Sequence, residues 1–92
     1  MPTTLADELR RHLREPFPDS VVKGRDYGEV DAVMIDADIF GWASRAGSLT
    51  ESDRAGLRHA GDELGRSLDA FPENARPYYE RLIRIARMAV AV

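Results

Sequence analysis

Residues 30–46 constrain the fold more than any other stretch of the chain, because they can form either a helix or a strand. A helix would place Asp31 and Asp38 on one side and apolar side chains over most of the remainder, so it would be largely buried. A strand would break the apolar-polar alternation at residues 33–35, which only a fully buried central strand tolerates. The rest of the sequence offers no set of partner strands. We therefore predict a helix here.

A shorter helix is expected before it, over about residues 4–15. Thr4 and Asp7 have the spacing of a capping box, in which each side chain bonds the other residue's backbone N–H. The prolines at positions 16 and 18 end the helix, because proline lacks an N–H and restricts the residue before it. The apolar side chains recur every four residues and predict the buried stripe, which is made by Leu5, Leu9 and Leu13.

Two more helices are expected in the second half of the chain. One starts at Thr50, whose hydroxyl can cap the N–H of Asp53. The other runs from about residue 74 or 76 to residue 91, with Pro77 in its first turn. The last helix is the most apolar element, so we expect it to be central.

These segments predict a single all-α domain over residues 1–92, with four helices and a compact glycine-containing turn between the first two. Gly24 and Gly28 provide the turn chemistry. The alternative is an α+β fold with one β-hairpin within residues 20–35, in which residues 21–22 pair with residues 30–35.

Composition and charge exclude several function classes. The 13 basic and 16 acidic residues give a net charge of −3, which argues against non-specific nucleic-acid binding. The chain has no cysteine, so disulfides and thiolate chemistry are excluded. The first fifteen residues lack the apolar run of a secretory signal, and residues 82–92 are too short to span a bilayer. We expect a soluble cytoplasmic protein with no membrane association.

The middle of the chain carries an acidic cluster, which could suggest a metal site. On a helix, however, Asp36 and Asp38 point about 200° apart and cannot share an ion. We therefore predict neither a metal nor a cofactor. Both histidines, His12 and His59, are expected on solvated helix faces.

Asp36 is the unusual member of this cluster, since helical geometry places it on the apolar side. A buried carboxylate needs a partner. Lys23, Arg25 or Tyr27 could supply it, or an arginine of the last helix. The functional alternative is an acid of raised pKa in a cleft.

The catalytic patterns that we searched for are missing: no serine lies near an obvious base, and no glycine loop has phosphate-binding spacing. We therefore expect a small non-enzymatic protein-interaction or regulatory module. Its partner would be an unidentified protein or a second copy, with Gly61 and Gly65 allowing close helix contact. The alternative is a small-ligand-binding protein or enzyme with Asp36 in a pocket. The expected binding surface is acidic and aromatic, and its candidate residues are Tyr27, Glu29, Asp31, Asp36, Asp38 and Trp42.

Overall fold

The computed structural model describes residues 3–92, and within them the chain forms four α-helices and two very short strands. The mostly helical four-helix prediction is thereby confirmed. The elements in chain order are α1 (Leu5–Arg14), β1 (Asp26–Tyr27), β2 (Val30–Asp31), α2 (Ala32–Ala43), the 3₁₀ turn η1 (Ala46–Ser48), α3 (Glu51–Ser67), the 3₁₀ turns η2 (Leu68–Ala70) and η3 (Glu73–Ala75), and α4 (Arg76–Val90).

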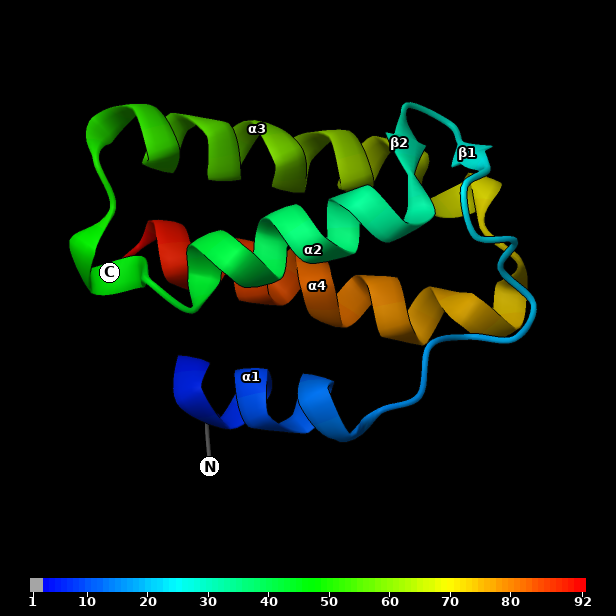
Figure 1. Ribbon diagram of the computed structural model, residues 1–92, viewed down its shortest axis with the longest axis horizontal. Helices are drawn as coiled ribbons and strands as arrows, with labels where there is room; N and C mark the ends of the chain where they lie inside the picture. The colour runs from blue at the N-terminus through cyan, green and yellow to red at the C-terminus, as the bar shows by residue number, and fades with distance from the viewer. Residues whose placement is uncertain (1–2) are drawn as a thin grey trace.

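Helix α4 is the central element. It contacts all three other helices. Figure 1 shows α1 as a separate layer on the opposite side of α4 from α3. The central place expected for the last helix is therefore confirmed, but the expectation that it is the most apolar element is wrong, because α2 is more apolar and carries no basic residue.

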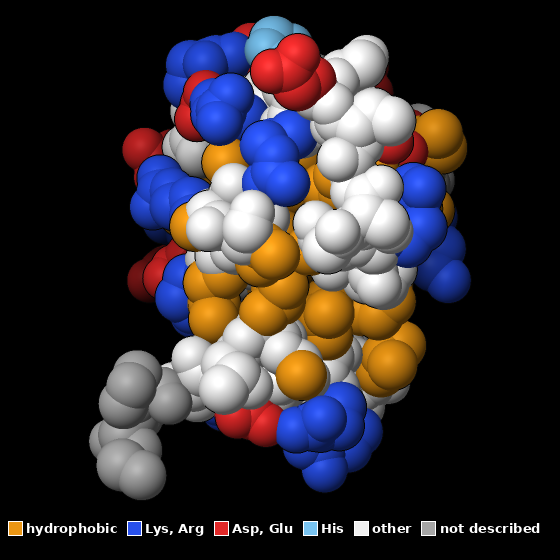
Figure 2. Space-filling view, turned by 90° about the vertical axis from the view of Figure 1, so that its left-hand side faces the viewer, with side chains coloured by type: hydrophobic (Ala, Val, Ile, Leu, Met, Phe, Trp, Pro, Cys, Tyr) orange, Lys and Arg blue, Asp and Glu red, His pale blue; other side chains and the backbone are white. Residues whose placement is uncertain are grey.

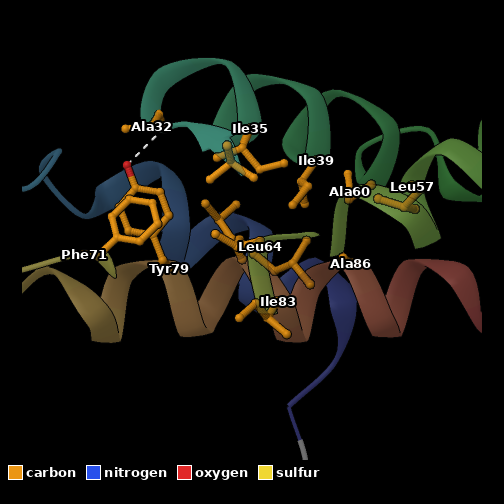
Figure 3. Close-up of a cluster of buried hydrophobic side chains, with 14 of the residues drawn as sticks. Ala32, Ile35, Ile39, Leu57, Ala60, Leu64, Phe71, Tyr79, Ile83 and Ala86 are labelled. Carbon is orange, nitrogen blue, oxygen red and sulfur yellow. Dashed lines mark hydrogen bonds between the residues drawn. The ribbon is translucent and has the colours of Figure 1, made fainter. Parts of the chain in front are cut away.

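The core fills the space between α4 and the pair α2 and α3. Ile39 and Leu64 are fully buried there, and Figure 3 shows side chains of all three helices meeting in one cluster. At one end of the cluster, the ring of Tyr79 stacks on Phe71 at 4.0 Å, and its hydroxyl donates to the Ala32 carbonyl at 3.0 Å. Burying such large apolar side chains contributes about 1.5–3 kcal/mol each, so this cluster stabilises the three-helix part of the fold.

The helix starts follow the predicted caps. The Thr4 hydroxyl accepts from the Asp7 N–H, and the Asp7 carboxylate accepts from the Thr4 N–H, which completes the capping box of α1. The Thr50 hydroxyl accepts from the Asp53 N–H at 3.0 Å. The helix expected over residues 30–46 is shorter than predicted, because the Asp31 carboxylate caps α2 by accepting from the N–H groups of residues 33 and 34.

The connection between α1 and α2 contains the two strands, which pair antiparallel with Tyr27 opposite Val30. Residues 26–27 therefore pair with β2, whereas the alternative prediction gave that place to residues 21–22. The turn needs Gly28, whose φ is +62°. A Cβ at this position would lie 2.7 Å from the Ser67 hydroxyl oxygen, so the turn also lies directly against the end of α3.

Gly61 allows α3 to approach α4 closely. A Cβ at Gly61 would lie 3.1 Å from the Cβ of Ala86, whereas one at Gly65 would meet no atom of the described residues within 4 Å. The predicted close helix contact thus exists at Gly61, but it is made within the chain.

The buried face of α1 differs from the predicted leucine stripe. Leu13 is 71% exposed, whereas Glu8 and His12 are buried and Leu5 and Leu9 are half-buried. The helix is rotated in this way because it packs against polar and aromatic side chains of α4.

Candidate functional site

A groove of about 640 Å³ lies between α1 and α2, with Tyr78 of α4 also lining it. The wall formed by α2 includes Val33 and Phe40, and the chain leaving α1 adds Phe17. Most of this lining is apolar. The acid that the sequence marked as unusual also lines this groove.

That acid, Asp36, joins three helices through two hydrogen bonds. Its Oδ1 lies 2.8 Å from Nε2 of His12 on α1, and its Oδ2 accepts from the Tyr78 hydroxyl of α4 at 2.5 Å. The partners proposed from the sequence, which were Lys23, Arg25, Tyr27 or an arginine of the last helix, are therefore wrong. The imidazole of His12 and the hydroxyl of Tyr78 take the place of those proposed partners.

His12 is a buried residue, only 5% exposed, so the prediction of a solvated face is wrong for it. Its ring lies between Tyr78 and Phe40, with centroid distances of 4.6 and 5.8 Å. The hydrogen bond between Nε2 and Asp36 occupies one of the two ring nitrogens. Nδ1 is buried and has no hydrogen-bond partner within the described chain. The nitrogen that could act as a base is therefore closed to solvent.

The Tyr78 hydroxyl remains a hydrogen-bond donor over the whole physiological range. Burial raises the pKa of Tyr78 far above its ordinary value, and the hydrogen bond and charge of Asp36 raise it further. Tyr78 therefore holds α4 to α2 as a neutral donor to the Asp36 carboxyl group.

Beside the groove, α1 rests on α4 through charged side chains. The Glu8 carboxylate accepts from the Thr3 hydroxyl at 2.9 Å, and its Oε2 lies 4.0 Å from Nε of Arg81. Arg81 also reaches Glu15, at 3.5 Å. Among the described residues, Glu8 Oε2 and Arg81 Nε have no hydrogen-bond partner. We call this contact, made by Glu8, Glu15 and Arg81, the polar seam.

The sequence reasoning missed the residues that surround Asp36 and the polar seam. One signal was available, because Glu8 and His12 follow Leu5 and Leu9 by three residues and thus lie on the same side of α1. His59, in contrast, is exposed as predicted, with Nε2 3.4 Å from Glu63.

Three other candidate residues have structural roles in the connection before α2. Tyr27 is buried against Phe71 at 4.8 Å, so it is not part of a surface. Glu29 forms two hydrogen bonds with Arg66, at 2.8 and 3.0 Å, and these lower the pKa of its carboxyl. Asp31 is the cap of α2.

The two remaining candidates lie farther along α2. Asp38 is exposed, and Trp42 is half-buried against α3, where its Cη2 lies 3.0 Å from the position of a Cβ on Gly56. At this end of the molecule, hydrophobic side chains gather in the middle of the face with charged groups around them (Figure 2). Of the six candidates, only Asp36 lines the groove, so the structure does not bring them together in one patch.

Comparison with known proteins gives no further identification: no family model, curated protein or solved structure matches the chain. Within residues 3–92, no helix has both the length and the apolar character needed to cross a membrane. The same residues contain no group of three or more histidine, aspartate or glutamate side chains placed to hold a metal ion.

Proposed function

We propose that this protein is a small non-enzymatic binding module that takes an apolar segment of a protein partner into the groove between α1 and α2. The observation that carries the proposal is the groove itself, about 640 Å³ in volume and lined largely by apolar side chains. Leu13 and Val33 line it and remain 71% and 37% exposed. Apolar side chains that line a concavity and face water are typical of binding sites.

The polar groups in the groove support binding over catalysis. A general base must reach the proton that it removes. His12 directs Nε2 to Asp36, while its other ring nitrogen is buried. The raised pKa of Tyr78 makes its phenolate inaccessible at neutral pH. These groups hold α1, α2 and α4 together.

The shape of the site favours a segment of another protein. The groove is open to solvent and has a helix on each side, which suits an amphipathic helix with apolar side chains at positions i, i+3, i+4 and i+7.

A small-ligand-binding function is the second candidate. The groove volume falls in the range of about 300–1,000 Å³ that is typical of small-molecule sites, and Asp36 would be the polar anchor.

Titrations monitored by the backbone amide resonances test the proposal. The probes are capped twelve-residue helical peptides with leucine at i, i+3, i+4 and i+7, and a matched set of aromatic fragments. We expect the peptides to shift resonances of α1 and α2 around the groove. Val33→Glu should abolish the shifts because it places a charge in the apolar lining. Met34→Glu is the matched control, since Met34 is 57% exposed on the same helix and does not line the groove.

Peptide binding elsewhere on the surface, or equal binding by the two variants, would contradict the proposal. Groove shifts produced by the fragments but not by the peptides would favour the small-ligand function in its place.

A further inference from the structure

We propose that the groove recognises a lysine side chain of the bound segment, whose ammonium lies beside Asp36 and the aromatic rings of the groove. This inference rests on the proposed function and specifies the chemistry of the partner. It follows from the charges of the lining, the unused acceptor capacity of Asp36 and a cation that the chain already places at the groove.

The charged residues that line the groove are Glu15, Lys23 and Asp36, which sum to one negative charge. The Asp36 side chain is 17% exposed, and each of its oxygens accepts one hydrogen bond from within the chain. A carboxylate offers about four acceptor positions, so about two remain for a ligand. An ammonium carries three donors and no acceptor, which complements this surface.

Aromatic side chains provide the second part of the site. Phe17, Phe40 and Tyr78 line the groove together with Asp36. The face of an aromatic ring attracts an ammonium within about 6 Å of its centroid. Rings beside a carboxylate therefore favour a cation with an apolar stem, and lysine has both features.

The chain itself already places a lysine ammonium over an aromatic ring of the groove. The ammonium nitrogen of Lys23 lies 5.4 Å from the ring centroid of Phe17, and both residues line the groove. Lys23 belongs to the exposed connection after α1. Its position shows that a lysine ammonium is accommodated at this aromatic wall, and a lysine of the partner would compete with it there.

Three capped helical peptides that differ at one central position test the inference. The position carries lysine, norleucine, which has a similar length without charge, or glutamate. We expect the lysine peptide to bind about fivefold more tightly than the norleucine peptide, and the glutamate peptide to bind most weakly. The readout is the dissociation constant from the groove amide shifts.

Single-residue variants of the protein then show which groove residues cause the preference for lysine. Asp36→Asn should reduce the lysine-to-norleucine ratio toward one, whereas Asp38→Asn, on the same helix outside the groove, should leave it unchanged. Phe40→Leu preserves an apolar wall and removes the ring face, so it should also reduce the ratio. Lys23→Met should strengthen binding of the lysine peptide by removing a like charge. Asp36→Asn weakens the hydrogen bonds from residue 36 to α1 and α4. If this substitution unfolds the protein, the Phe40→Leu and Lys23→Met variants determine whether the groove recognises lysine.

The two proposals fail in different ways. If none of the peptides shifts the groove resonances, the proposed function is wrong. If all three bind the groove with equal affinity, or if Phe40→Leu and Lys23→Met leave the ratio unchanged, the groove binds a segment but lysine recognition is overturned.

Discussion

The two sides of α4 are packed by opposite chemistry. Toward α2 and α3 it presents buried side chains such as Tyr79, which stacks on Phe71, and Ala86, which packs against Gly61 of α3. Toward α1 it presents Arg81, whose partners Glu8 and Glu15 satisfy it incompletely. The first side specifies the fold through apolar burial, whereas the second attaches α1 through polar groups together with the half-buried Leu5 and Leu9.

This difference indicates how stability is distributed. Large apolar side chains contribute about 1.5–3 kcal/mol each on burial, whereas the attraction in a buried ion pair is largely offset by desolvation. Helices α2, α3 and α4 should therefore unfold together, and α1 should open at a lower free energy. The groove lies beside the helix that is held less strongly.

The largest effect should come from the apolar side. Leu64→Ala removes a fully buried side chain from the cluster shared by α2, α3 and α4, and it should lower the free energy of unfolding by about 3 kcal/mol. Urea denaturation measures this change. A loss below 1 kcal/mol would contradict the central role of this cluster.

The polar seam should respond differently to single and double changes. Arg81→Leu leaves the buried Glu8 carboxylate without its cation and should lower the free energy of opening α1 by about 2 kcal/mol. The double variant Glu8→Leu with Arg81→Leu should recover most of this loss, because a well-packed apolar pair avoids desolvation of the charges. A double-mutant cycle measured by amide hydrogen exchange within α1 checks the coupling, and additive losses would show that the seam is not an ion pair in energetic terms.

The two threonine caps allow a finer comparison. Thr50→Ala removes the cap of α3 and should lower the global free energy of unfolding by about 1 kcal/mol. Thr4→Ala removes the cap of α1. It should speed amide hydrogen exchange within α1 while the global urea midpoint moves little. Equal shifts of the midpoint for both variants would show that α1 unfolds together with the rest.

The last prediction concerns stability in alkaline solution and has no effect at neutral pH. Burial raises the pKa of Tyr79 well above its ordinary value of 10.0. Above pH 10 the unfolded chain releases this proton while the folded chain retains it, so stability falls as pH rises, by about 1.4 kcal/mol per pH unit for this group. Tyr79→Phe should flatten the measured slope between pH 10 and 11. An unchanged slope would mean that other groups cause it.

The helices and their caps could be predicted because the signals are local. Threonine followed by an acid three residues later, and proline at the first turn, give the starts of α1, α3 and α4. The end of α2 and the short strands could not be placed as well, since two-residue pairing produces no periodic pattern.

The surroundings of Asp36 could not be derived from the sequence, because its partners come from distant helices. The leucine spacing in α1 predicted the wrong buried face, since the face bearing Glu8 and His12 is stabilised by residues distant in the sequence, such as Arg81, Tyr78 and Asp36. The choice between the two faces depends on tertiary contacts that local periodicity does not contain.

The contact between Trp42 and Gly56 gives the molecule a built-in optical reporter. Trp42 is the chain's single tryptophan, and its indole is pressed between α2 and α3, on the side of the fold that does not carry α1. Its fluorescence emission should change when those two helices separate and should stay unchanged when α1 detaches from the rest of the fold. Thermal unfolding followed by circular dichroism would then begin at a lower temperature than unfolding followed by fluorescence. The difference in signal would correspond to the unfolding of α1 before α2 and α3 separate.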